Sequence, residues 1–172
     1  MKSTTAEVDG ALAADLQAVA EEWVRQFAEG WRAPADADSF ADHFDPLMTD
    51  DVRLIQPQMP TAVGRPAFRE QFARPVFELI PDLHATVHTW AAQANAVLIE
   101  FTLSGTLGGR PVSWRCVDRV TLRDGLACER RAYFDPTPLL AAVATRPRAW
   151  PRFARLQAQQ LGRRLRQGGQ NR

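Results

Sequence analysis

Cysteine is scarce in this chain, which has only Cys116 and Cys128 among its 172 residues. Two cysteines cannot build the dense disulfide framework of a small secreted domain. No run approaches 18 consecutive apolar residues, so we expect no transmembrane helix. The first ten residues include acids and lack the apolar stretch of a secretory signal. Together these absences favour a cytoplasmic protein with reduced thiols.

Motifs for nucleotide and metal binding are also missing. The sequence contains no GxGxxG and no P-loop pattern, which leaves nucleotide binding without support. Histidine occurs three times, and His84 and His88 fall four positions apart in a segment that reads as a strand. At that spacing their side chains would stand roughly 13 Å apart, too far to share one ion. We therefore predict no metal site and no cofactor.

Acidic residues are absent from the end of the chain. Residues 146–172 hold eight arginines and no acid, whereas residues 1–145 carry a net charge of −7. Apolar residues also recur at helical spacing in this basic segment, at Trp150, Phe153 and Leu156. We predict a tail, helical in part or disordered, that packs on the body or on a second subunit. Contact with nucleic acid or an anionic membrane is the less favoured alternative.

The body of the chain reads as helices followed by strands. Leu12, Leu16, Val19, Trp23 and Phe27 form one face of an amphipathic helix. The remaining patterns predict one α+β domain over residues 7–145, with residues 146–172 as a separate tail. Its expected elements are a helix over 7–29 ended by Gly30, a short helix opened by Ser39 and Asp42, a strand over 52–56, a helix from Gly64 with Pro66 in its first turn, strands over 83–91, 96–106, 111–122 and 126–134, and a closing helix over 136–144.

One ionisable residue interrupts an apolar strand face. The even positions from Val112 to Leu122 are all apolar except Asp118. Side chains alternate between the two faces of a strand, so Asp118 is expected to point into the core. A buried carboxylate needs a charged partner, or its pKa rises until it keeps its proton. Asp118 is therefore either half of a buried salt bridge or an acid/base group in a pocket.

The register of the next strand decides what faces this carboxylate. If Asp124-Gly125-Leu126 forms a three-residue loop, Asp118 pairs with Ala132 and has Arg130 on its diagonal. A two-residue turn would instead place Arg131 opposite Asp118. We favour the longer loop because it keeps apolar residues opposite one another. In that register the two cysteines lie roughly 20 Å apart, which excludes a disulfide between them.

Several short motifs resemble one superfamily when taken in order. They are the run over residues 63–70, Pro81-Asp82-Leu83, Gly105-Thr106 with Gly108, residues 117–120, Asp124-Gly125 and residues 133–135. Across residues 10–145 the chain resembles ketosteroid isomerases, SnoaL-like polyketide cyclases, limonene epoxide hydrolases and nuclear transport factor 2. This resemblance implies a cone formed by a curved, mostly antiparallel sheet around N-terminal helices. Asp118 matches the aspartate that serves as acid/base in SnoaL-like cyclases.

Two mechanisms of the superfamily do not fit this sequence. The isomerases use an aspartate before a proline on the first strand, where this chain has Gln56-Pro57, and a tyrosine from the first helix, whereas Tyr133 is the only tyrosine here. The epoxide hydrolases have a catalytic acid at the position of Ala132. What remains is an apolar pocket with one carboxylate.

The resemblance therefore implies an enzyme without cofactor that moves protons on a hydrophobic small molecule, by cyclisation or isomerisation. A non-catalytic binding or assembly domain of the same fold is the alternative. We expect a homodimer formed through the open sheet face. Asp118 is the candidate catalytic residue, and the candidate substrate-binding residues are Gln56, Gln58, Trp114, Arg130, Phe134, Trp23, Phe27 and Phe72.

Overall fold

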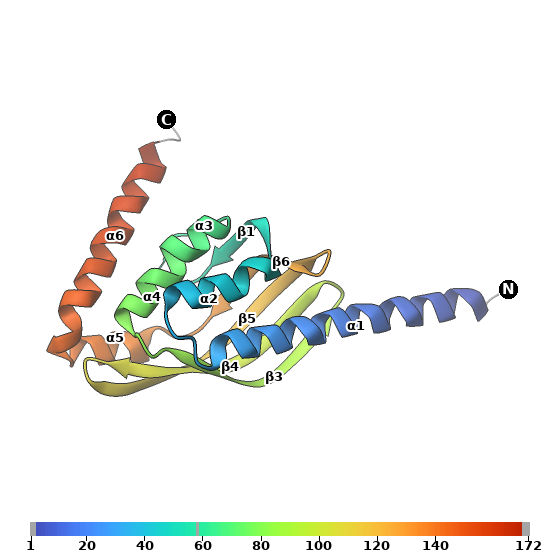
Figure 1. Cartoon of the computed structure of the whole chain (residues 1–172), viewed down its shortest axis with the longest axis horizontal. Coiled ribbons are helices and arrows are strands. Elements are labelled where there is room, and N and C mark those ends of the chain that lie inside the picture. The colour runs from blue at the N-terminus through green and yellow to red at the C-terminus, as the bar shows by residue number, and fades with distance from the viewer. Residues whose placement is uncertain (1–2, 58, 170–172) are drawn as a thin grey trace.

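The computed structural model describes residues 3–57 and 59–169, with side chains described for residues 14–57, 59–159 and 161–162. A curved, unclosed sheet carries the N-terminal helices on one face, and a pair of C-terminal helices stands at one end (Figure 1). The α+β cone expected from the sequence is confirmed. None of the described helices combines the length and the apolar character that crossing a membrane requires.

Six strands form the sheet in the order β2-β1-β6-β5-β4-β3. Every neighbouring pair is antiparallel except β1 and β6, which run parallel. The predicted strand over 52–56 begins earlier than expected. The strands are β1 (Met48–Ile55), β2 (Ala62–Val63), β3 (His84–Gln93), β4 (Ala96–Leu107), β5 (Arg110–Arg123) and β6 (Leu126–Tyr133).

The first helix, α1 (Ser3–Arg32), does not end at Gly30 as predicted. A Cβ atom at Gly30 would lie 2.4 Å from Cδ2 of His43 and 2.7 Å from Cε2 of Phe44, so glycine lets the two helices meet. The N-terminal part of α1 extends past the sheet (Figure 1). Leu16 and Val19 are each 40% exposed and do not join the core as expected.

Helix α2 (Ala37–Phe44) is capped one turn earlier than the sequence suggested. Asp36 is the N-cap, and its carboxylate accepts a hydrogen bond from the backbone N–H of Ser39 at 2.8 Å. The Ser39 hydroxyl accepts one in return from the Asp36 backbone N–H, which completes a capping box. A 3₁₀ turn (Asp45–Leu47) then leads into β1.

The third helical region is confirmed at Gly64 but is irregular beyond it. It comprises α3 (Arg65–Ala67), a π-helical turn η2 (Phe68–Ala73) and α4 (Arg74–Leu79). π-Helical turns are rare and occur mostly at functional sites. Here the turn carries Phe68 and Phe72, and both side chains are buried.

The hairpin between β5 and β6 differs from the expected loop but restores the expected register. Asp124 and Gly125 form a two-residue turn, with φ of 53° and 78°. Both residues adopt positive φ, as a type I′ hairpin requires. A bulge at the strand ends then shifts the ladder by one residue, so Asp118 pairs with Ala132 as predicted. The three-residue loop was wrong because the bulge supplies the extra residue.

The C-terminal segment is helical over most of its length. After α5 (Thr137–Ala144) and a 3₁₀ turn (Pro147–Ala149), helix α6 spans Trp150–Gly169. Leu156 is buried, and the Arg155 guanidinium lies 2.6 Å from the Glu78 carboxylate at the end of α4. The first half of α6 therefore packs on the body. The domain boundary at residue 145 and the homodimer remain predictions.

Candidate functional site

Asp118 and Arg130 form a buried ion pair. Asp118 is 0% exposed and the Arg130 side chain is 12% exposed, and Nε of Arg130 donates a hydrogen bond to Oδ2 of Asp118 at 2.5 Å. The ladder explains the contact, because Arg130 pairs with Val120 and so lies diagonally from Asp118. The salt bridge foreseen in the sequence is present.

The second oxygen of Asp118 is not used in the same way. Oδ1 is buried and has no hydrogen-bond partner among the described residues. A buried carboxylate oxygen without a donor is costly, and each such group in a native structure calls for an explanation. One oxygen of Asp118 therefore holds an arginine, and the other is left without a hydrogen-bond donor among the described residues.

Burial governs the ionisation of this site. Removal from water raises the pKa of Asp118, and the charge and hydrogen bond of Arg130 oppose that rise. The neighbouring Cys116 thiol has its pKa raised to about 12, first by burial and then by the negative charge of Asp118. A thiol with that pKa stays protonated at neutral pH, so Cys116 is a wall residue and not a nucleophile.

Arg130 connects the buried carboxylate to the cavities of the protein. Its Nη1 lies 3.4 Å from Oε1 of Gln56, and its guanidinium carbon lies 5.0 Å from the centre of the Phe72 ring. The side chain lines both of the cavities described below. A substrate oxygen in either cavity would meet a cationic hydrogen-bond donor that is already held in place.

The larger of two neighbouring cavities, called the main pocket here, has a volume of about 110 Å³. Its walls are apolar, apart from a few polar groups that include Gln56, Arg130 and Gln157. The lining residues are Trp31, Gln56, Pro57, Met59, Phe72, Val76, Leu79, Ile80, Leu83, Leu103, Trp114, Cys116, Arg130, Ala132, Phe134, Pro136, Leu139, Leu140, Phe153, Leu156 and Gln157.

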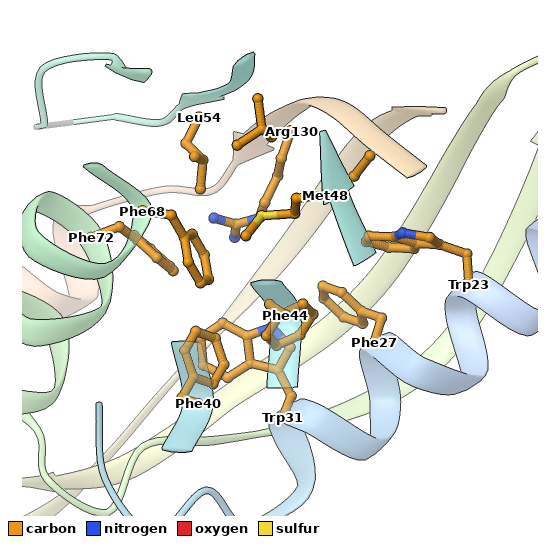
Figure 2. A pocket seen from close by; sticks show the side chains of 12 residues that line it. Trp23, Phe27, Trp31, Phe40, Phe44, Met48, Leu54, Phe68, Phe72 and Arg130 are labelled. Carbon is orange, nitrogen blue, oxygen red and sulfur yellow. The ribbon is translucent and has the colours of Figure 1, made fainter. Parts of the chain in front are cut away.

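The smaller cavity, called the aromatic cavity here, has a volume of about 20 Å³, close to the space that one water molecule needs. Figure 2 shows the Arg130 guanidinium reaching into it beside Met48, Phe68 and Phe72. Trp31, Phe72 and Arg130 line both cavities, so these three side chains form the boundary between them. The full lining is Trp23, Phe27, Trp31, Phe40, Phe44, Met48, Val52, Leu54, Phe68, Phe72, Ala127 and Arg130.

The predicted site residues divide between these places. The main pocket contains Gln56, Trp114 and Phe134, the aromatic cavity contains Trp23 and Phe27, and Arg130 and Phe72 line both. Gln58 lies outside the described residues.

Asp118 itself lines neither cavity, because Arg130 covers it on one side. Its neighbours Cys116 and Ala132 do line the main pocket. The carboxylate therefore lies one layer beneath the pocket surface, and not at that surface as the sequence suggested.

The sequence reasoning missed the pocket residues contributed by the C-terminal helices. Phe153, Leu156 and Gln157 all come from α6, which the charge pattern had set apart as a tail. The apolar spacing of Phe153 and Leu156 was the available signal, since it showed that one face of this helix must be covered.

The histidines take no part in the site. His43 lies 2.9 Å from the Gln26 carbonyl, between α1 and α2, and lines neither cavity. His84 contacts the Asp82 carbonyl, and His88 contacts the Thr102 hydroxyl. Among the residues that the structure describes, no cluster of three or more histidine, cysteine or acidic side chains could hold a metal ion.

Solved structures share this fold. A candidate SnoaL-like polyketide cyclase from Jannaschia sp. CCS1 is 25% identical, with a TM-score of 0.65 over 74% of this chain and 93% of that one. TerC, co-crystallised with polyporic acid, is 20% identical, with a TM-score of 0.64 over 74% of this chain and 99% of its own. An M. tuberculosis LEH-like epoxide hydrolase is 19% identical, with a TM-score of 0.59 over 77% of this chain and 95% of its own.

A search among curated proteins finds no match to this chain. The family model for the SnoaL-like domain matches residues 24–130, which include the sheet residues Asp118 and Arg130 and the helices packed on them. The buried Asp118–Arg130 pair and the part of the main pocket that precedes residue 131 thus lie within a known domain type, and the chain belongs to the SnoaL-like domain family.

Proposed function

We propose that this protein is an enzyme that moves a proton at a carbon next to a carbonyl group of a hydrophobic small molecule. The observation that carries the proposal is the Asp118–Arg130 pair. It joins a fully buried carboxylate to a guanidinium that lines two apolar cavities. Paired groups of this kind in a cleft are typical of acid/base sites.

The chemistry assigns one role to each partner. Asp118, ionised, takes a proton from the substrate carbon on its unpartnered oxygen Oδ1. The electron pair of the broken C–H bond moves into the carbonyl group, and the resulting enolate oxygen accepts hydrogen bonds from the Arg130 guanidinium. Asp118 then returns the proton to another carbon in an isomerisation. In a cyclisation the enolate carbon attacks a second carbonyl, and the proton goes to the new alkoxide.

The environment favours this use of Asp118. Its raised pKa brings the carboxyl nearer to neutral pH, where a group can both accept and donate a proton efficiently. The apolar walls keep water from the enolate, and Arg130 is held by Asp118 and Gln56 before substrate arrives. A preorganised donor of this kind costs no rearrangement during the reaction.

A ligand-binding domain without catalysis is the second candidate. The observation in its favour is that Asp118 already accepts a hydrogen bond from Arg130 and lines neither cavity. In that case the carboxylate only positions the guanidinium, which would bind an oxygen of the ligand. The experiment that follows separates the two.

The test uses 2-tetralone, a small apolar ketone whose C1 protons are acidic. Exchange of these protons with deuterium is followed by NMR in heavy water, with the wild type and with Asp118→Asn. Asp124→Asn is the matched control, because Asp124 lies in the exposed β5–β6 turn, where asparagine also tolerates positive φ.

We expect the wild type and the control to accelerate exchange alike. Asp118→Asn should slow exchange by about 10²-fold or more, the scale of general acid–base catalysis. If Asp118→Asn still binds 2-tetralone and exchanges its protons at the wild-type rate, Asp118 is not the base and the binding domain is the better account.

A further inference from the structure

The C-terminal helices form part of the main pocket. Six of its lining residues lie at or beyond position 136, and half of them come from α6. They are Pro136, Leu139, Leu140, Phe153, Leu156 and Gln157. The charge pattern marks this segment as an appendage, but its apolar residues Phe153 and Leu156 line the pocket, whereas Arg152 and Arg155 do not.

Specific contacts hold this wall in place. The indole N–H of Trp150 donates a hydrogen bond to the Val143 carbonyl at 2.9 Å, which fixes the start of α6 to α5. Arg155 forms its ion pair with Glu78, and Leu156 is only 9% exposed. The anchoring residues Trp150 and Leu156 lie on either side of Phe153 in sequence, and Gln157 directly follows Leu156. The contacts of α6 with the body thus hold both side chains at the pocket.

This wall lies outside the family match. The match ends at residue 130, before all six of these residues. Asp118 and Arg130 therefore belong to the matched SnoaL-like domain, whereas the outer wall of the pocket comes from the chain that follows it.

From these observations we infer that α6 determines which molecules this pocket accepts. The ligand is an elongated, mostly apolar molecule with two polar ends. Its inner end carries an acceptor oxygen for Arg130 and Gln56, and this assignment rests on the proposed function. Its outer end carries a polar substituent at Gln157, which is exposed at the rim, and its apolar middle packs on Phe153 and Leu156. Phe153 and Gln157 are specificity-determining residues.

The experiment compares a long and a short probe. The long probe is the dye trans-4,4′-dihydroxystilbene, which has an oxygen at each end and becomes more fluorescent when a site restricts its rotation, and the short probe is 2-naphthol. Dissociation constants are measured for the full-length wild type, Phe153→Ala, Gln157→Trp and Gln159→Trp. Gln159 is an exposed residue of the same helix that does not line the pocket, so Gln159→Trp controls for the added indole.

We expect the dissociation constant of the long dye to rise by about tenfold in Phe153→Ala, because this variant loses part of the apolar wall. We expect a similar rise in Gln157→Trp, because the added indole fills the rim. Both should bind 2-naphthol within about twofold of wild type, and Gln159→Trp should bind both probes within that range, as for an ordinary surface change. Unchanged affinity for the long dye in both wall variants would overturn the inference. So would an equal loss in Gln159→Trp, or a wild type that binds 2-naphthol but not the dye.

These outcomes are independent of catalysis. Normal proton exchange in Asp118→Asn would refute the proposed function without changing any dye affinity. Unchanged dye affinities in the wall variants would refute the role of α6 and leave Asp118 as the base.

Discussion

Ala132 lies directly opposite Asp118 in the β5–β6 ladder, and Ala132 lines the main pocket whereas Asp118 does not. Residues facing each other across an antiparallel ladder have Cβ atoms about 5 Å apart. A small side chain at position 132 therefore leaves the carboxylate close beneath the pocket surface. Under the proposed function, substrate would approach Asp118 past this small residue.

Ala132→Val should reduce proton exchange without disturbing the ion pair. The two added methyl groups extend over Asp118 into the pocket, and valine is well tolerated in a strand. We expect 2-tetralone exchange to fall by about tenfold or more, a loss of the order of 1–2 kcal/mol in transition-state stabilisation. The NMR exchange assay measures the rate, and urea unfolding should show stability within about 1.5 kcal/mol of wild type. An unaltered rate would mean that substrate does not approach Asp118 past Ala132.

Arg130→Gln should make stability depend on pH. Burial raises the pKa of Asp118 above its ordinary value of 3.8, and loss of Arg130 removes the effect that opposes this rise. A group whose folded-state pKa is raised stabilises the fold fully below its unfolded pKa, and this contribution is lost as pH increases through the folded value. The deficit of Arg130→Gln should therefore be smallest below about pH 3.8 and grow toward neutral pH, reaching roughly 3–5 kcal/mol.

The control for this pH dependence is the double variant Asp118→Asn/Arg130→Gln. It has no carboxylate to bury, so its deficit relative to wild type should not grow with pH over that range. Urea unfolding at several pH values gives both curves. Parallel curves for the single and double variants would show that the carboxylate of Asp118 is not what Arg130 stabilises.

Phe72→Ala should merge the two cavities. The Phe72 ring lines both, lies over the Arg130 guanidinium, and has its centre 5.4 Å from that of Phe68. Removing a buried phenylalanine ring costs roughly 3–5 kcal/mol when the space does not collapse. Phe72→Leu keeps most of the apolar volume and should cost clearly less. Equal unfolding midpoints for wild type and Phe72→Ala would show that this ring is not part of the packed boundary.

The sequence revealed Asp118 because its strand is long and its alternation regular. Five apolar residues share its face, so a single acid among them is conspicuous. The register with Ala132 was also predicted, although through the wrong turn. A bulge cannot be read from alternation alone, because it depends on how Asp124 and Gly125 settle into positive φ. The wrong turn length and the missed bulge shift the register in opposite directions, so the predicted pairing of Asp118 with Ala132 is still correct.

Other features of the site depend on tertiary packing, which the sequence alone does not show. Whether Asp118 faces the pocket or lies beneath Arg130 depends on side-chain placement in the closed cone. Leu16 and Val19 fit the helical stripe as well as Trp23 does, but each is 40% exposed, whereas Trp23 is 5% exposed. The position of α6 at the pocket depends on which part of the protein covers its apolar face. The excess of arginine in residues 146–172 instead suggested a separate tail.

The most direct measurement is a crystal structure of the protein with 2-naphthol, a stable analogue of the enol of 2-tetralone. The account predicts the naphthol oxygen within hydrogen-bond distance of the Arg130 guanidinium and ring carbon C1 about 3–3.5 Å from Oδ1 of Asp118, the separation of a reacting pair. A naphthol ring bound elsewhere, or one in the main pocket with a side chain still lying between C1 and the carboxylate, would contradict proton transfer by Asp118.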